Sequence, residues 1–95
     1  LKHPTYADGH LVLGEIYQVQ GRIEEATKCY LEALPHARTK YERSTANFRL
    51  GEVYRARGKL ALAREKFRET LKHDPKFEGA LKALAEIGDS EESPL

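Results

Sequence analysis

Histidine and cysteine are the residues of this 95-residue chain whose chemistry would say most about function, because both can ligate transition metals. The sequence holds four histidines, His3, His10, His36 and His73, and one cysteine, Cys29. Two imidazoles bind one metal ion from a helix when they lie about one turn apart, and no two of these histidines have that spacing. We therefore predict surface or turn histidines, no metal or other cofactor, and a cysteine that packs as a small, partly buried hydrophobic side chain.

Two carboxylates, Glu15 and Glu52, are candidates for acid–base chemistry because they recur at the same point of a repeated stretch. No glycine-rich phosphate loop and no nucleophile elbow accompanies them in the sequence. Recognition of a peptide, or pairing with Arg49 and Arg55, accounts for these carboxylates better than catalysis does. We expect a protein that is not an enzyme.

An excess of cations marks residues 55–72. The segment contains Arg55, Arg57, Lys59, Arg64, Lys66, Arg68 and Lys72 against Glu65 and Glu69. Such an excess is typical of nucleic-acid binding. These charges, however, surround a predicted helix on all sides, and the neighbouring aromatic residues occupy predicted core positions, so no base-stacking surface is left. We interpret the segment as a solvated face and expect no nucleic-acid partner.

Length and composition predict one small soluble domain. The chain is 40% hydrophobic and 33% charged, with a formal net charge of +1. It has neither an apolar run long enough to cross a bilayer nor a basic-then-apolar leader, so we expect no membrane partner. A lone cysteine forms no internal disulfide and fits a reducing, cytoplasmic location. Because Leu1 is not a natural start, we expect the chain to be an excerpt from a longer protein.

One stretch of sequence occurs twice. The segment GEIYQVQGRIEEATKCY at 14–30 is followed 37 residues later by GEVYRARGKLALAREKF at 51–67. In each copy, apolar residues recur with the helical period on both sides of a glycine, Gly21 or Gly58. Glycine adopts the left-handed backbone that closes a helix, so each copy predicts a helical hairpin.

A second pair of glycines, Gly14 and Gly51, lies inside the first predicted helix of each copy. Glycine is unfavourable in a helix interior, by about 0.5 to 1 kcal/mol relative to alanine. We therefore expect the backbones of two helices to approach closely there, with Ala26 and Ala63 meeting the glycines from the second helix.

Capping signals and prolines predict five helices and no strand. Thr5 with Asp8, and Thr39 with Glu42, have the spacing of N-terminal caps, and Pro35 stops or kinks a helix. The first predicted helix covers about residues 6–20, and the second has Glu24 and Glu25 in its first turn and runs to about 34. The others run from the Thr39 cap to 57, over 59–72 and over 76–87.

These residues resemble the tetratricopeptide repeat, a helix–turn–helix unit with a usual period of 34 residues. The first copy meets its pattern with Leu13-Gly14, Tyr17, Gly21, Ala26, Tyr30 and Ala33, and the second with Leu50-Gly51, Tyr54, Gly58, Ala63, Phe67 and Pro75. The departures are His10 and Asn47 in place of an aromatic residue, Thr70 in place of alanine, and three extra residues and no terminal proline in the first unit.

The resemblance implies an all-α fold, an α–α superhelix of right-handed solenoid type with about five helices. Its expected divisions are residues 1–6 as the tail of a preceding repeat or a linker, 7–40 and 41–75 as two units, 76–88 as a capping helix or half repeat, and 89–95 as a flexible tail.

The resemblance also implies a concave groove, lined by the first helix of each unit, that holds a peptide or a partner helix. The corresponding positions are Asp8, Leu11, Glu15, Gln18, Val19, Thr45, Phe48, Arg49, Glu52, Arg55, Lys82 and Glu86. Arg49 and Arg55 would bind a carboxylate, and Leu11, Val19 and Phe48 would seat an apolar side chain, unless Phe48 packs between helices. A clamp for the C-terminal carboxylate of a chaperone is disfavoured, because Glu15 would repel that carboxylate.

Two functions follow from these sequence features. The first is a non-enzymatic protein–protein interaction scaffold that binds a peptide or partner helix in the groove. The alternative is a structural segment of a longer repeat array, which stacks or forms a homo-oligomer through an exposed repeat edge.

Overall fold

The computed structural model describes residues 5–88, and this part of the chain forms α-helices and one short 3-10 helix without any strand. The elements are α1 (Tyr6–Val19), α2 (Ile23–Ala33), the 3-10 helix η1 (Leu34–His36), α3 (Lys40–Ala56), α4 (Leu60–His73) and α5 (Glu78–Ile87). The five α-helices confirm the predicted all-α fold class. The predicted tail at 89–95, and residues 1–4 of the predicted N-terminal segment, lie outside the described residues.

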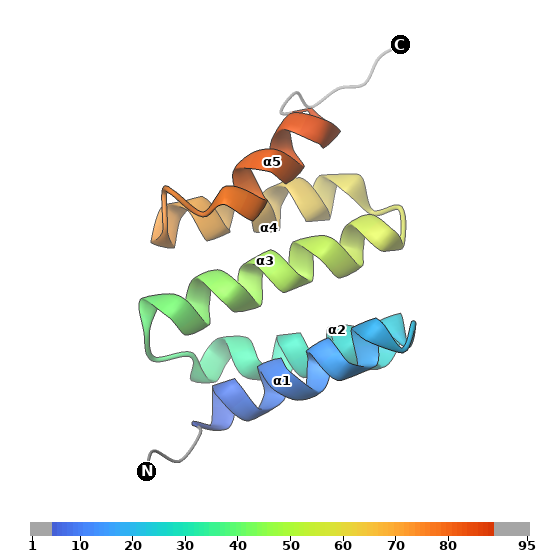
Figure 1. Cartoon of the computed structure of the whole chain (residues 1–95), viewed down its shortest axis with the longest axis vertical. Helices are drawn as coiled ribbons and strands as arrows, with labels where there is room; N and C mark the ends of the chain where they lie inside the picture. The colour runs from blue at the N-terminus through green and yellow to red at the C-terminus, as the bar shows by residue number, and fades with distance from the viewer. Residues whose placement is uncertain (1–4, 89–95) are drawn as a thin grey trace.

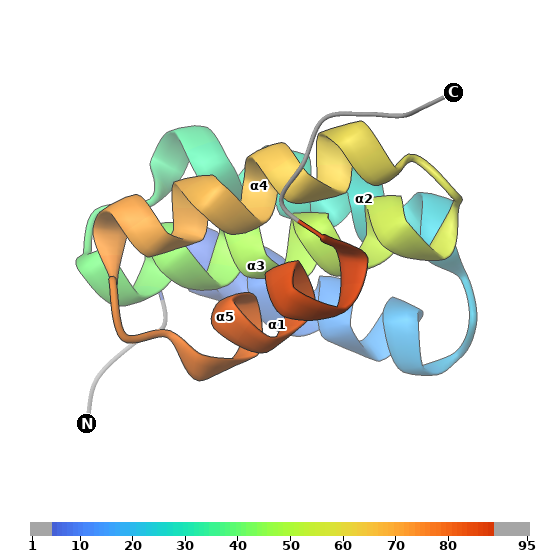
Figure 2. The ribbon, with the colours of Figure 1, turned by 90° about the horizontal axis from the view of Figure 1, so that it is seen from above.

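Two antiparallel hairpins, α1–α2 and α3–α4, stack along the long axis of the molecule, and α5 packs on the second hairpin (Figure 1). Figure 2 shows that α2 and α4 lie on one side of α3, while α1 and α5 lie on the other. The helices α1, α3 and α5 therefore share one face of the molecule. No described helix has both the length and the apolar character needed to span a bilayer.

Both predicted chain reversals are closed by glycine. Gly21 and Gly58 have φ angles of +79° and +77°, in the left-handed region that glycine enters without strain. The next residue donates its backbone N–H back across the turn, from Arg22 to the Tyr17 carbonyl at 2.8 Å and from Lys59 to the Tyr54 carbonyl at 2.9 Å. These bonds satisfy carbonyls at the helix ends, so the two reversals are equivalent.

The predicted N-terminal caps of α1 and α3 are present. The hydroxyl of Thr5 accepts the backbone N–H of Asp8, and the hydroxyl of Thr39 accepts that of Glu42, each at 3.0 Å. Helix α5, by contrast, begins at Glu78 rather than at the predicted residue 76. A turn intervenes, because the backbone N–H of Phe77 bonds to the Asp74 carbonyl at 3.1 Å.

The mid-helix glycines make room for aromatic rings rather than for alanines, which corrects the prediction. A Cβ added to Gly14 would lie 2.5 Å from a ring atom of Tyr30, and one added to Gly51 would lie 2.5 Å from a ring atom of Phe67. Ala26 is fully buried, as is Ala63, but neither is among the atoms nearest to these glycines. Each unit therefore joins its two helices through a ring seated on a glycine.

The core consists of two clusters, one formed by α1, α2 and α3 and the other by α4 and α5. The first contains Ala7, Leu11, Ala26, Tyr30, Ala33, Ala46, Leu50 and Val53, and the second contains Ala63, Phe67, Ala80 and Ala83. Cys29 is buried, as predicted, and its burial raises the pKa of the thiol, with the charge of Glu32 acting in the same direction.

A buried carboxylate connects the two hairpins at their N-terminal ends. Glu42, only 5% exposed, accepts hydrogen bonds from the Thr5 hydroxyl, at 2.5 Å, and from the backbone N–H of Arg38, at 2.8 Å. The N–H of Arg38 and then the Thr5 hydroxyl hold the pKa of Glu42 below its usual value, against the opposing effect of burial. The cap of α1 is thereby bonded to the first turn of α3.

Candidate partner-binding groove

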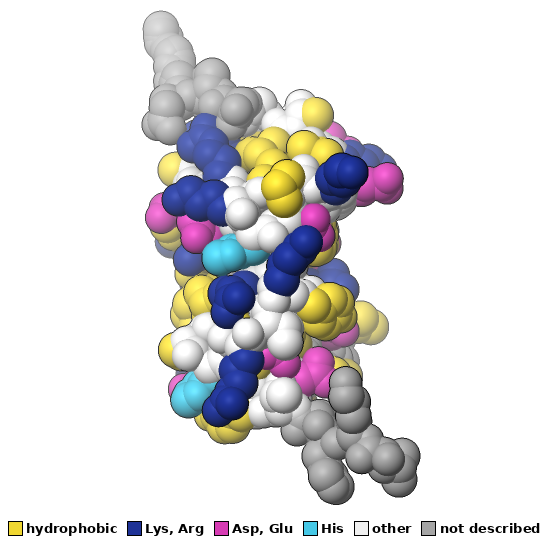
Figure 3. Space-filling model, turned by 90° about the vertical axis from the view of Figure 1, so that its left-hand side faces the viewer, with side chains coloured by type: hydrophobic (Ala, Val, Ile, Leu, Met, Phe, Trp, Pro, Cys, Tyr) yellow, Lys and Arg dark blue, Asp and Glu magenta, His cyan; other side chains and the backbone are white. Residues whose placement is uncertain are grey.

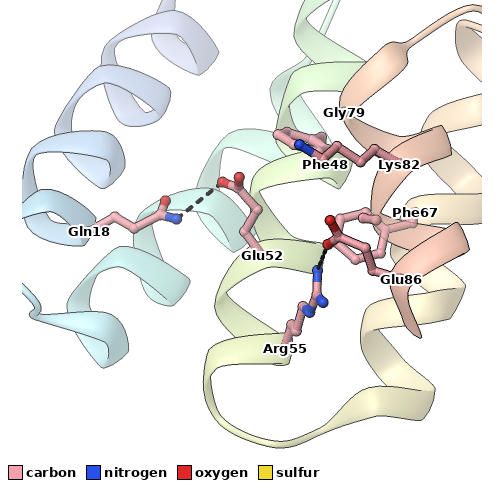
Figure 4. A pocket seen from close by; sticks show the side chains of 9 residues that line it. Gln18, Phe48, Glu52, Arg55, Phe67, Gly79, Lys82 and Glu86 are labelled. Carbon is pink, nitrogen blue, oxygen red and sulfur yellow. Dashed lines mark hydrogen bonds and ion pairs between the residues drawn. The ribbon is translucent and has the colours of Figure 1, made fainter.

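Two adjoining hollows lie on the face formed by α1, α3 and α5. The larger, of about 400 Å³, is lined by Gln18, Phe48, Glu52, Arg55, Phe67, Gly79, Lys82, Ala83 and Glu86 (Figure 4). The smaller, of about 310 Å³, is lined by Glu15, Gln18, Val19, Arg49 and Glu52. They share Gln18 and Glu52, so we treat them together as one feature, the groove.

A continuous chain of hydrogen bonds fixes the side chains at the middle of the groove. The buried Tyr30 hydroxyl donates to Gln18 Oε1 at 2.6 Å, and Gln18 Nε2 donates to Glu52 Oε1 at 3.1 Å. Arg49 donates to the same oxygen of Glu52 at 2.9 Å and to Glu15 Oε2 at 3.1 Å. The network joins α1, α2 and α3, so the side chains in this part of the groove hold one another in place.

Arg49 is the centre of this network. Its burial lowers the pKa of the guanidinium, but the hydrogen bond and charge of Glu52, followed by those of Glu15, outweigh burial and raise the pKa overall. Its guanidinium carbon also lies 5.7 Å from the centre of the Phe48 ring, within the range of a cation–π contact. Arg49 is therefore charged, and it is already bonded to two carboxylates of its own chain.

The α5 side of the groove contains a second ion pair and a lysine. Arg55 Nη1 lies 3.0 Å from Glu86 Oε1, which connects α3 to α5. Lys82 is exposed, and its ammonium group has no hydrogen bond or ion pair within residues 5–88. Figure 4 shows Lys82 beside Phe48 on the far side of the hollow from Gln18.

Aromatic rings form the floor under α5. The Phe48 ring lies 4.8 Å from the Phe77 ring and 5.7 Å from the Phe67 ring, measured between ring centres. A Cβ on Gly79 would lie 2.7 Å from the Phe48 ring, so this glycine allows α5 to approach it. Phe48 is thus packed between helices while it also lines the hollow.

Most of the predicted groove residues are brought together. Nine of them line the hollows: Glu15, Gln18, Val19, Phe48, Arg49, Glu52, Arg55, Lys82 and Glu86. Leu11 and Thr45 are buried, at 2% and 6% exposure, so neither can seat a partner's side chain. Asp8 lines neither hollow. Of the three residues expected to contact an apolar side chain, Val19, which is 89% exposed, and Phe48, which lines the larger hollow, are accessible.

The sequence interpretation missed the part that Tyr30 plays in the groove. The repeat pattern includes Tyr30 but assigns no role to its hydroxyl, which holds Gln18 in position. The repeat contained a signal, because the equivalent position of the second unit is Phe67, which has no hydroxyl. A tyrosine that replaces phenylalanine in a buried position requires a polar partner for its hydroxyl.

The cations of residues 55–72 are distributed among acidic neighbours. Arg57 lies 3.9 Å from Glu24 of α2, and Lys72 lies 3.5 Å from Glu69. Figure 3 shows one side of the molecule, on which Lys and Arg side chains are interspersed with hydrophobic and acidic ones. The structure thus places several of these cations in ion pairs.

The described histidines have structural neighbours. The Tyr6 ring lies 4.4 Å from both the His10 and the His36 ring, and His73 Nε2 lies 3.4 Å from Glu69 Oε2. These contacts give each of the three histidines a place in packing or pairing.

Comparison with known proteins gives a match to a family. The family model described as tetratricopeptide repeat matches residues 6–76, which covers both hairpins and the turn that leads toward α5. Neither the search of curated proteins nor the search of solved structures gave a significant match.

Proposed function

The chain belongs to the tetratricopeptide repeat family, whose members are interaction modules and typically non-enzymatic, and from this we propose that its groove binds a peptide segment of a partner protein. In this proposal, the protein is a scaffold that holds a rigid surface ready for the partner and performs no catalysis.

The observation that carries the proposal is the hydrogen-bond network at the middle of the groove. Tyr30, Gln18, Glu52, Arg49 and Glu15 hold one another in fixed positions while their hollow stays open. A receptor surface that is already ordered loses little conformational entropy when it binds. This arrangement favours recognition of a flexible segment, since only the partner has to become ordered.

Selection from a displayed library of random peptides tests the proposal. We expect peptides that bind the wild-type chain and lose binding in the double variant Glu52→Lys/Arg55→Glu, which alters the groove without changing net charge. The matched control is Glu24→Lys/Lys28→Glu, which makes the same exchange on exposed positions of α2, outside the groove. Circular dichroism establishes that both variants remain helical. Selected peptides that bind all three proteins equally would contradict the proposal.

A second candidate function, stacking or self-association through the α1 edge, is favoured by a difference between equivalent residues. Leu50 and Val53 of α3 are fully buried against the first hairpin. Their equivalents in α1, Leu13 and Ile16, are 40% and 48% exposed. An apolar helix face of this kind is the face that a neighbouring repeat covers in a solenoid.

Sedimentation analysis over a wide range of protein concentration tests this second function. We expect a concentration-dependent increase in mass that the variant Ile16→Lys abolishes, because a charge on this face must be desolvated to form the contact. A mass that stays monomeric throughout would remove self-association through this edge.

A further inference from the structure

We propose that the groove selects a peptide that places a basic side chain against Glu15 and Glu52 and an acidic side chain beside Lys82. The inference rests on the proposed function and deepens it, because it names the chemistry of the partner. It also reverses the sequence expectation for Arg49, which was assigned to a carboxylate of the partner.

The α1 side of the groove has an unbalanced negative charge. Glu15 and Glu52 share one cation, Arg49, at 3.1 and 2.9 Å. Each carboxylate uses a single oxygen in these bonds, and Glu15 Oε1 and Glu52 Oε2 have no donor in the part of the chain that the structure describes. Two free acceptor oxygens and a surplus of one negative charge favour a lysine or arginine of the partner.

A carboxylate of the partner is disfavoured at the same place. To reach Arg49, it would have to displace Glu15 or Glu52 from the guanidinium, and the displaced carboxylate would remain in the groove. Like charges in such a half-buried site repel each other. Arg55 is occupied in the same way by Glu86 at 3.0 Å. Neither arginine is therefore available to a carboxylate without breaking an ion pair.

The α5 side of the groove has a positive charge that is unpaired in the described part of the chain, in contrast to the negative charge of the α1 side. Arg55 and Glu86 neutralise each other, which leaves Lys82 as the cation of this hollow without a partner among residues 5–88. Lys82 projects from α5, whereas Glu15 projects from α1, so the two charges are separated by the width of the groove. A partner segment that crosses the groove from α1 to α5 would therefore pass the carboxylates of Glu15 and Glu52 first and the ammonium group of Lys82 second.

An apolar contact completes the description on the α1 side. Val19 lines the smaller hollow together with Glu15 and Glu52, and it is 89% exposed. A basic residue with a long aliphatic stem, or an apolar neighbour of that residue, would cover Val19 and remove it from water. The fitting partner segment therefore has apolar and basic residues at one end and an acidic residue at the other.

The peptides selected from the random library test this inference. Among peptides whose binding is lost in Glu52→Lys/Arg55→Glu, we expect enrichment of Lys or Arg on one side of the sequence and Asp or Glu on the other. For one such peptide, fluorescence anisotropy should show that replacing its basic residue with glutamate weakens binding about fivefold or more.

Single substitutions in the protein test where the basic and the acidic residue of the peptide bind. Glu15→Gln leaves Arg49 neutralised by Glu52 alone and should reduce the preference for the basic residue. Lys82→Glu should weaken binding of the original peptide and favour a version whose acidic residue is changed to lysine. Lys28→Glu, an equal charge reversal on an exposed residue of α2, is the control and should leave the affinity unchanged.

The outcomes separate this inference from the proposed function. Groove-bound peptides that lack the charge pattern, or whose affinity is insensitive to Glu15→Gln and Lys82→Glu, would overturn the inference and leave the groove as a binding site. A library that yields no peptide sensitive to the groove variant would overturn the proposed function and this inference together.

Discussion

At the scale of single residues, Glu42 shows how one carboxylate holds the two hairpins in register. It is 5% exposed and accepts hydrogen bonds from Thr5 of the first hairpin and from the Arg38 backbone N–H that precedes α3. A buried carboxylate without donors would be strongly destabilising, so these bonds are required for its burial.

Replacement of Glu42 should therefore destabilise the protein in a way that depends on pH. At neutral pH we expect Glu42→Ala to lower the free energy of unfolding by about 2 kcal/mol or more, since two donors lose their charged acceptor. Because the folded pKa of Glu42 lies below its usual 4.5, the carboxylate stabilises fully above that value, and its contribution is lost as pH falls through the folded pKa.

Urea unfolding at several pH values measures this effect. Glu42→Gln keeps the size of the side chain and should show a smaller loss of stability between neutral and acid pH than the wild type. Glu65→Gln, at an exposed position of α4, should behave as the wild type. Equal pH profiles for Glu42→Gln and the wild type would refute a special role for Glu42.

The contacts of Glu42 show which hydrogen bonds can be predicted from the sequence. The spacing of Thr39 and Glu42 predicts their capping bond, because a cap depends only on neighbouring residues. The bond from Thr5 spans 37 positions of sequence and depends on how the hairpins stack, which no local pattern encodes. The pairing of Arg49 with Glu15 has the same origin. The sequence therefore offers this ion pair only as an alternative to a bond between Arg49 and a carboxylate of a partner.

At the scale of elements, each hairpin is joined through an aromatic ring that rests on a glycine. The repeat predicts the helices and their glycine reversals, because these follow from the helical period and from backbone freedom. It did not predict that Tyr30 and Phe67, rather than alanines, face Gly14 and Gly51. Ring placement depends on the distance and rotation between packed helices, which periodicity leaves open.

Two substitutions of glycine by alanine separate the effect of ring packing on stability from the effect of helix propensity. Gly51→Ala should destabilise the protein by about 1 to 3 kcal/mol, because its Cβ would lie 2.5 Å from the buried Phe67 ring. Gly9→Ala, in α1 with no atom within 4 Å of the added Cβ, should be neutral or stabilising by up to about 1 kcal/mol. Thermal unfolding measures the stability of both variants. Equal changes in stability would show that the Phe67 ring is not in contact with Gly51.

At the scale of the whole molecule, the small net charge conceals an uneven distribution. Helices α1 and α2 contain five carboxylates and one lysine, whereas α3 and α4 contain eight cations and four carboxylates. Contacts between the parts offset this difference, as in the pairs of Arg49 with Glu15 and Arg57 with Glu24. The second hairpin is therefore less available to phosphate than its count of cations suggests.

Binding of single-stranded RNA should accordingly be weak. We expect a dissociation constant above about 100 µM near physiological salt, with a shallow dependence on salt, because the ion pairs of Arg49, Arg55 and Lys72 reduce the number of counterions that phosphate contacts would release. Fluorescence anisotropy at several salt concentrations measures both quantities. Tight binding with a steep salt dependence would instead assign the second hairpin to nucleic acid.

A partner segment in the groove between α1, α3 and α5 would change the amide chemical shifts of the residues around it, so mapping these shifts with a selected peptide locates the binding site. We expect the largest shift changes at residues such as Gln18, Glu52 and Lys82, which line the two hollows. Shifts concentrated on the exposed surfaces of α2 and α4, with those three residues unmoved, would contradict binding in the groove.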